Sequence, residues 1–197
     1  GMQYHPPYYK DLFENYGFQI YFEQNTYRKN LNESFPERQE KFARHVGDKK
    51  GYTFDHYTDK EQDKYIDHIT YIFNEVWKGF HEDYTPLEKS EVKKIFLNAK
   101  EIVDEELLVF AYHEGKPVAM IIVLPDVNQV TKKMKGKLNT LTKIKFVLNK
   151  KKIDMGRLLM TGVVPSYQRT YIIGALFLKM VDTMKRKNYK VLEMSWV

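Results

Sequence analysis

The stretch VVPSYQRTYIIGALF, residues 163–177, decides which fold the chain is expected to have. It continues a β-rich run, GRLLMTGVV at 156–164, bends at Pro165 and passes into a helical pattern. A helix that begins directly after such a turn presents free backbone N–H groups, which bind phosphate groups well. These turns usually have glycine where the backbone approaches phosphate closely, whereas here Tyr171 and Ile173 occupy those places.

The elements predicted around this stretch follow the order β-α-α-β-β, an insertion, and then β-α-β. Alternating β-branched and aromatic residues predict the strands, and apolar residues every three or four positions predict the helices. Capping boxes at Thr58-Glu61 and Thr85-Glu88 predict the starts of the first two helices. This order is typical of a mixed α/β fold and not of a doubly wound repeat. The predicted ranges are strands at 52–57, 156–164 and 190–197, a hairpin at 106–125, and helices from 58, from 85 and at 173–187.

The N-terminal part stands apart from this pattern. Residues 1–30 show a short helix closed by Gly17 and then an alternating, strand-like run at 18–27. Residues 31–51 are mostly polar and are interrupted by proline and glycine, which predicts a linker. The predicted organisation is therefore a helix–strand segment, a linker, and a main domain at 52–197 with a basic insertion at 126–154.

The composition is that of one globular domain of ordinary size. Hydrophobic residues make up 43% of the 197 residues and aromatic residues 15%, which is enough for a core. The absence of cysteine excludes a disulfide framework, a thiol nucleophile and a thiolate metal site. No apolar run approaches the roughly 20 residues of a membrane span, and no secretory signal is recognised, so a cytoplasmic location is expected. The net charge of +6 favours anionic partners.

The order of elements and the bend Val164-Pro165-Ser166-Tyr167-Gln168 together resemble the GNAT superfamily of acyl-CoA N-acyltransferases. The resemblance covers residues 52–197 and implies a central, mostly antiparallel sheet flanked by helices. The family's Q/R-x-x-G-x-G/A loop falls on 168–173, where Gln168 matches and neither glycine is present. LPDVNQ at 124–129, the basic insertion and a final EMSW resemble a little-characterised bacterial subgroup with tandem domains.

The resemblance implies acetyl-CoA or another acyl-CoA as co-substrate and an amine as acceptor. The pantetheine arm would bond backbone groups between two splayed strands, near Thr161, Gly162 and Val163. The pyrophosphate would accept hydrogen bonds at the N-terminus of the following helix. The residues implied there are Gln168, Arg169, Thr170, Tyr171, Ile172, Ile173 and Gly174.

Members of the superfamily usually continue with another helix and strands beyond the segment that corresponds to 190–197, and this sequence does not contain them. A strand at 190–197 would then be an exposed sheet edge, which proteins usually cover. We therefore expect residues 6–27 to fill the missing place, in the same chain or by strand exchange in a homodimer. The alternative for residues 1–30 is the end of a preceding GNAT-like unit.

Candidates for catalysis are few. Glu193, on the last predicted strand, is a weak candidate for the general base, because a lone acid on an alternating strand is usually only a polar residue. Trp77, Phe80 and Tyr84 are candidates for the acceptor cleft, which this region borders in the superfamily. The six histidines show no metal-type spacing, so no metal is expected.

The insertion is the strongest charge feature of the sequence. Residues 127–153 contain nine lysines and no acidic residue, and Leu141, Ile144, Val147 and Leu148 form an apolar stripe through them. Solvated lysines on a helix docked to the core are the simplest interpretation. Steering of an anionic substrate, an anionic membrane surface and RNA are the alternatives, and nucleic acid is not expected because no recognised motif accompanies the charge.

Three functions follow from these observations. The first is transfer of an acyl group from an acyl-CoA to an unknown amine. The second is an inactive GNAT-like interaction or scaffold domain, because the loop has lost its glycines. The third is binding to an anionic surface through the insertion.

Overall fold

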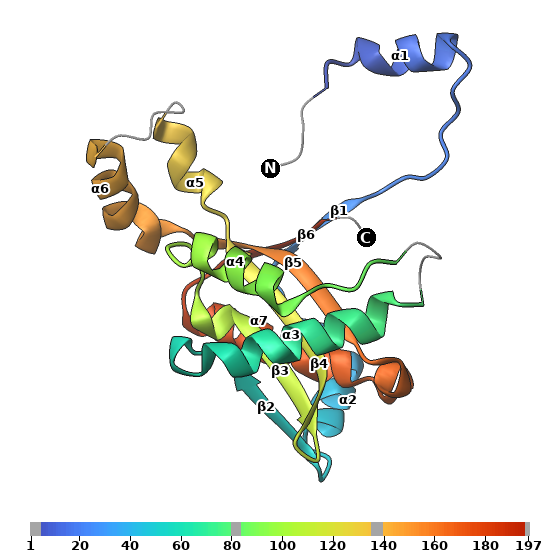
Figure 1. The fold of residues 1–197 in the computed structure, drawn as a ribbon, viewed down its shortest axis with the longest axis vertical. Helices are drawn as coiled ribbons and strands as arrows, with labels where there is room; N and C mark the ends of the chain where they lie inside the picture. Colours follow the sequence, from blue (N-terminus) through green and yellow to red (C-terminus); the bar gives the residue numbers. More distant parts are fainter. Residues whose placement is uncertain (1–4, 80–83, 135–139, 196–197) are drawn as a thin grey trace.

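The computed structural model describes residues 5–79, 84–134 and 140–195. Six strands form one twisted sheet in the spatial order β1-β6-β5-β4-β3-β2 (Figure 1). All neighbours are antiparallel except β5 and β6, which run parallel because α7 connects them as a crossover helix. This confirms the mixed α/β prediction. The strands are β1 (Thr26–Asn30), β2 (Tyr52–His56), β3 (Leu108–His113), β4 (Lys116–Pro125), β5 (Met155–Val163) and β6 (Val191–Ser195).

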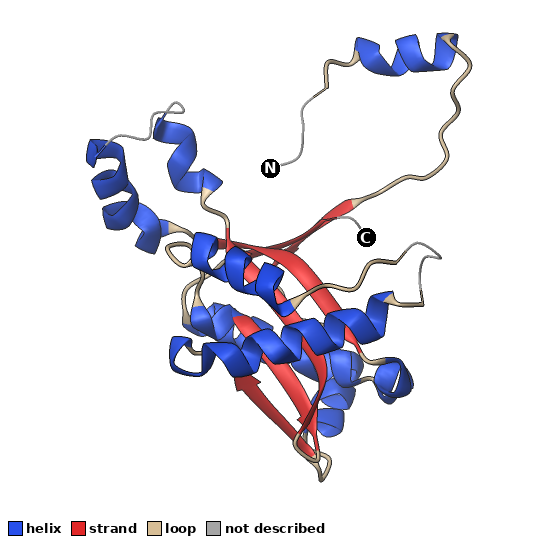
Figure 2. Ribbon diagram, viewed as in Figure 1, coloured by secondary structure: helices blue, strands red, loops and turns tan. Residues whose placement is uncertain are grey.

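Helices cover both faces of the sheet (Figures 1 and 2). On one face, α3 (Gln62–Trp77) and α4 (Lys89–Ala99) pack against β3 and β4 around Phe110 and Met120. On the other, α7 (Ile172–Arg186) packs around Ile121, and α2 (Glu37–Gly47) lies against α7. Because β3 and β4 are covered on both faces, most of their residues are apolar and buried.

The predicted hairpin at 106–125 is confirmed as β3 and β4. Its two-residue loop, Glu114-Gly115, has positive φ at both positions, as the twist of a tight hairpin requires.

The predicted linker at 31–51 is wrong for most of its length, because it contains α2. Ala43 and Val46 of this helix are buried, and a Cβ added at Gly47 would lie 3.2 Å from the Cβ of Ala175 on α7. The apolar face of α2 consists of few residues among many charges, so its periodicity is weak in the sequence. Close packing on α7 stabilises it.

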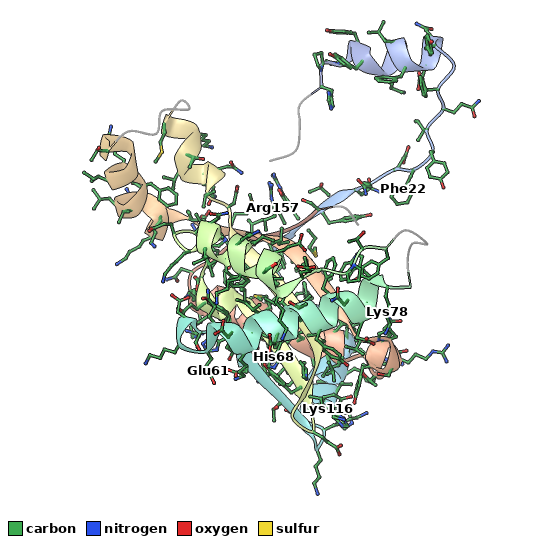
Figure 3. The ribbon with its side chains drawn as sticks, in the orientation of Figure 1. Phe22, Glu61, His68, Lys78, Lys116 and Arg157 are labelled. Carbon is green, nitrogen blue, oxygen red and sulfur yellow. The ribbon has the colours of Figure 1, made fainter. Side chains whose placement is uncertain are left out.

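The N-terminal strand was predicted at 18–27, and the structure places it at Thr26–Asn30, antiparallel to β6. The edge of β6 is therefore covered within the same chain, but only the last two residues of the predicted strand take part. Residues 18–25 are exposed and irregular, and Phe22 projects away from the body (Figure 3). Helix α1 (Tyr8–Asn15) buries none of its residues.

The helix start predicted at Thr58 is confirmed in position, because a 3₁₀ turn at Asp59–Glu61 begins there and leads into α3, whereas the start predicted at Thr85 is wrong. Neither Thr58 nor Thr85 forms a side-chain cap in the structure. Helix α4 begins at Lys89, after a capping box made by Glu88 and Glu91. The segment from Tyr84 to Leu87 is instead fastened to α3 through Asn74, which takes the chain away from helical geometry.

The insertion forms α5 (Asn128–Thr131) and α6 (Thr140–Asn149), each followed by a turn of 3₁₀-helix at Lys132–Met134 and Lys150–Lys152. They stand away from the sheet at the end where β5 begins (Figure 1).

Candidate functional site

The turn after β5 is a 3₁₀-helix, Pro165–Thr170, joined to α7 by Tyr171. Tyr171 adopts the left-handed conformation, with φ 61° and ψ 18°. This region strongly favours glycine because a Cβ crowds the following carbonyl. The first of the two missing glycines therefore stood at a position with a real backbone requirement, and tyrosine occupies it under strain.

The second missing glycine has no such requirement. Ile173 lies in the first turn of α7 and packs against the core cluster. Gly174, one residue later, faces α2, where an added Cβ would lie 3.4 Å from that of Ala43. Gly174 therefore serves helix packing, and α7 begins at Ile172 without a shift toward this glycine.

The N-terminus of α7 retains free donors. The N–H of Gly174 donates to the carbonyl of Tyr171 at 3.0 Å. The N–H groups of Ile172 and Ile173 have no acceptor among the described residues. Arg169 is exposed on the same turn and makes no ion pair in the described part of the chain. The turn thus offers two amide donors and one cation.

Neighbouring side chains anchor this turn. The ring of Tyr171 meets Phe42 of α2 edge-to-face at 5.3 Å. Tyr167 packs against both core clusters, and its hydroxyl lies 3.1 Å from Nδ1 of His113. The amide of Gln168 donates to the carbonyl of Val163 at 3.4 Å. Gln168, the one residue that matched the loop pattern, therefore ties the turn back to β5.

Strands β5 and β6 run together only at their beginnings. Their register extends from Met155↔Val191 to Leu158↔Met194. Beyond it, within the described residues, 159–163 of β5 have no partner on the side of β6. Leu159 is also the extra residue of a β-bulge against β4, which bends β5 at this point. The predicted segment Thr161, Gly162 and Val163 lies in this opening, next to the turn.

The end of α3 lies directly over the opening. A Cβ added at Gly162 would lie 3.3 Å from side-chain atoms of Ile72 and Val76 and 3.5 Å from Trp77. Trp77 stacks on Phe73, with ring centroids 4.6 Å apart. The hydroxyl of Tyr84 donates to Oδ1 of Asn74 on α3. The structure brings these two candidate cleft residues to one end of α3, and Phe80 lies outside the described residues.

Glu193 is the centre of a cross-strand ion-pair ladder. Arg28 on β1 and Arg157 on β5 stand beside it in register. Nε of Arg28 lies 2.9 Å and Nη2 of Arg157 2.6 Å from its carboxylate oxygens. Its side chain is 4% exposed. Burial raises the pKa of Glu193, but the two guanidinium groups outweigh burial and hold the pKa below its ordinary value.

These contacts oppose the use of Glu193 as a general base. A base must release its hydrogen-bond partners to accept a proton, and here two cations hold the charged form. Nε of Arg157 is buried without a hydrogen-bond partner among the described groups, so the ladder is not fully satisfied. Sequence reasoning missed both arginines because their pairing depends on strand register.

Sequence reasoning also missed a cleft of about 850 Å³ at the other end of the sheet. The acidic segment before β3 forms one wall and Phe146 with Lys150 and Lys151 forms the other. Lys187 pairs with Asp104 at 2.7 Å on its floor. Since β5 is nine residues long and separates this cleft from the turn by roughly 30 Å, the cleft is not part of the same site.

The described part of the chain contains neither a metal-type cluster of side chains nor a membrane-spanning helix. Nowhere in it do three or more histidine or acidic side chains come together as a metal site would require. Its helices include none with the length and apolar character needed to cross a membrane.

Comparisons with known proteins agree with this geometry. No family profile matches the chain. A curated relative named bacterial ceramide synthase, from Caulobacter vibrioides, is 26% identical over 141 residues, which is 68% of this chain and 36% of that protein. The chain spans about a third of the length of the curated relatives it matches.

Two solved structures have a similar fold. A GCN5-related N-acetyltransferase from Sphaerobacter thermophilus matches with a TM-score of 0.56 and 13% identity, over 95% of this chain and 46% of that one. The C-terminal domain of a putative lysylphosphatidylglycerol synthetase from Agrobacterium fabrum matches with a TM-score of 0.53 and 11% identity, over 97% and 52%. The strand order, the opening between β5 and β6 and the turn before α7 thus identify this chain as a domain with the fold of the GCN5-related N-acetyltransferases.

Proposed function

We propose that the chain is an N-acyltransferase domain that moves an acyl group from a CoA thioester to an amine. The observation that carries the proposal is the opening between the parallel strands β5 and β6 beside the free N–H groups of α7. In the reaction the amine nitrogen forms a bond to the acyl carbon and the carbon–sulfur bond breaks. The amine loses a proton, and CoA leaves as the thiol.

The free edge of β5 at Thr161, Gly162 and Val163 would hold the pantetheine arm through backbone hydrogen bonds. Such an edge binds an extended chain as another strand would. The segment lies close to the end of α3, so an acyl group in the opening would be near Trp77.

The turn from Gln168 to Gly174 would hold the pyrophosphate. The amides of Ile172 and Ile173 would donate to it, supported by the helix dipole and by the charge of Arg169. The side chain of Tyr171 is engaged by α2 and that of Ile173 by the core. Both are occupied by protein neighbours, which favours access to the N–H groups despite the lost glycines.

The acceptor proposed here is the amine of an amphipathic molecule. The Caulobacter relative is named a ceramide synthase, and ceramide is a long-chain amino alcohol acylated on nitrogen. The end of α3 supplies the large aromatic rings of Trp77 and Phe73, which suit an apolar chain. A proton acceptor for the amine is not assigned, because the ion pairs of Glu193 oppose that role.

A scaffold domain without activity is the second candidate, and the strained Tyr171 is the observation that favours it. A turn that no longer binds phosphate has no need for glycine. In that case the domain would act by binding other molecules through its surface, and acyl-CoA would not bind.

Calorimetric titration with acetyl-CoA, palmitoyl-CoA and CoA tests the proposal. We expect saturable binding that weakens about tenfold in Arg169→Gln, because an exposed cation near a diphosphate is worth roughly 1 kcal/mol or more. Lys94→Gln, an equal charge change on exposed α4, is the matched control and should bind as the unmodified chain does. No binding of any CoA compound, in a chain that unfolds cooperatively, would refute the proposal.

Activity is then measured as release of CoA thiol with long-chain amino alcohols and with short polyamines. Because the chain contains no cysteine, a thiol reagent reports only CoA. Thiol release with the amino alcohols alone would support an amphipathic acceptor. Release with polyamines alone would contradict it and leave the acyltransferase proposal standing.

A further inference from the structure

The insertion carries apolar side chains on its outer surface. Ile144, Val147 and Leu148 of α6 are 52%, 55% and 70% exposed. Their spacing of three and four residues places them on one face of the helix. Phe146 lines the cleft on the body of the domain, so this exposed face points away from it. The predicted stripe is thus directed outward in these three residues, and the side chain of Leu141 lies outside the described ones.

Four lysines lie on the same helix or in the turn that follows it, and two of them, Lys150 and Lys151, also line the cleft. Lys145, Lys150, Lys151 and Lys152 are all exposed. The sequence has no acidic residue between Asp126 and Asp154, so nothing within the insertion neutralises them. The simplest expectation, a helix docked on the core with only lysines outward, is therefore not what the structure shows.

The base of the insertion is fixed to the sheet. The side-chain amide of Gln129 donates to Asp154 at 2.8 Å and accepts from the N–H of Asp154 at 3.1 Å. Val130 is buried in the core cluster. The helices are therefore presented from a firm base, at the end of the sheet farthest from the β3–β4 hairpin (Figure 1).

We propose that the end of the insertion, with the exposed face of Ile144, Val147 and Leu148 and the four exposed lysines of α6 and the turn after it, docks on an anionic lipid bilayer. Exposed aliphatic side chains flanked by lysines are the composition of helices that lie in a membrane interface. The lysines are attracted to anionic headgroups while the three aliphatic residues enter the acyl boundary. RNA-binding surfaces use aromatic stacking beside their cations, and the exposed residues here are aliphatic.

The proposal goes beyond acyl transfer and does not depend on it. The measured quantity is binding to vesicles without any CoA compound. A chain that binds vesicles and no acyl-CoA would retain this inference and lose the proposed function, and the reverse result would separate them equally well.

The experiment is flotation of the chain with vesicles of phosphatidylcholine, with and without 30% phosphatidylglycerol. We expect binding only to the anionic vesicles, and weaker binding as salt rises from 0.1 to 1 M, where the screening length falls from about 10 to about 3 Å. Lys150→Gln/Lys151→Gln/Lys152→Gln should bind at least tenfold more weakly, since each lysine at the surface contributes roughly fivefold. Val147→Ser/Leu148→Ser should also weaken binding.

Matched controls change the same residue types elsewhere. Lys49→Gln/Lys50→Gln/Lys116→Gln removes three exposed lysines at the opposite end of the molecule, where Figure 3 shows Lys116. Ile95→Ser/Leu97→Ser alters two exposed residues of α4. Both should bind vesicles normally.

Three outcomes would overturn the inference. The first is no binding to anionic vesicles. The second is an equal loss of vesicle binding in the lysine variant and in its control, which would show that only the net charge of the protein matters. The third is binding that the insertion variants leave unchanged, which would assign it to the exposed N-terminal aromatic residues. Titration with a labelled RNA runs in parallel, and tight RNA binding without vesicle binding would replace the membrane by nucleic acid.

Discussion

Replacing Tyr171 by glycine should give a more stable protein than replacing it by alanine, the reverse of the usual order in and near helices. Both substitutions remove the ring that meets Phe42, so that loss cancels in the comparison. The remaining difference is the left-handed backbone at φ 61°, which costs a residue with a Cβ about 1–2 kcal/mol. The greater freedom of glycine in the unfolded chain offsets about 0.5–1 kcal/mol of this.

The net expectation is that Tyr171→Gly exceeds Tyr171→Ala by about 1 kcal/mol in unfolding free energy. For a domain of this size that is a difference in Tm of roughly 2–4 °C. Ile173 is the internal control, because it lies in the helix two residues later. At that position the unfolding free energy of Ile173→Ala should be about 0.5–1 kcal/mol higher than that of Ile173→Gly.

Urea unfolding followed by circular dichroism measures all four variants, with m-values compared to confirm the same transition. The decisive result is that glycine gives the higher unfolding free energy at position 171 and alanine gives the higher unfolding free energy at position 173. Alanine as stable as glycine at position 171 would mean that the turn is not left-handed, and the account of the missing glycine would then be wrong.

Three further predictions concern the sheet. Glu193→Gln should lower the unfolding free energy at pH 7 by roughly 2–3 kcal/mol, because two guanidinium groups lose a buried partner. The folded pKa of Glu193 is depressed, so this stabilisation is present above the ordinary carboxyl pKa and is lost as pH falls through the folded pKa. The difference in unfolding free energy between variant and unmodified chain, measured by urea unfolding, should therefore shrink as the solution is acidified. Gly156→Ala should lower the unfolding free energy by about 2–3 kcal/mol, because an added Cβ would lie 2.7 Å from a valine methyl. Gly162→Ala should lower it by only about 1 kcal/mol, because an added Cβ there would lie no closer than 3.3 Å to any side chain. Equal melting temperatures of the two variants would contradict this. Deleting residues 1–24 should leave the melting temperature unchanged, because all of the described residues among them are exposed except one partly covered proline. Deleting residues 1–31 also removes β1 and a fully buried leucine, and should lower the melting temperature by several degrees or abolish the transition.

Much of the fold was predictable because its signals are local. The short stretch His113-Glu114-Gly115-Lys116, which contains glycine and lies between two β-rich runs, predicted the hairpin. The bend at Pro165 before an apolar helical run predicted the strand–turn–helix unit. Helix α2 was not predictable in this way, because its buried face is small and forms only against α7.

The residues of the candidate site were also only partly predictable from the sequence. Gln168 and the segment 161–163 were implied by the resemblance to the GNAT superfamily, and the structure places the segment at the opening between β5 and β6 with Gln168 bonded back to Val163. The partners of Glu193 were not found, because Arg28 and Arg157 are 165 and 36 residues away in sequence and meet it only through strand register. The same register turns an apparent base into a closed ion-pair ladder.

By itself, the sequence determined the order of strands and helices, the loss of two glycines from the turn and the charge of the insertion. These are properties of neighbouring residues and of their periodicity. Only the tertiary structure decided that β1 covers β6, that the strain falls on Tyr171 and not on Ile173, and that the apolar stripe of α6 faces outward. Each of these depends on which surfaces pack together, and packing joins residues whose distance along the chain carries no signal.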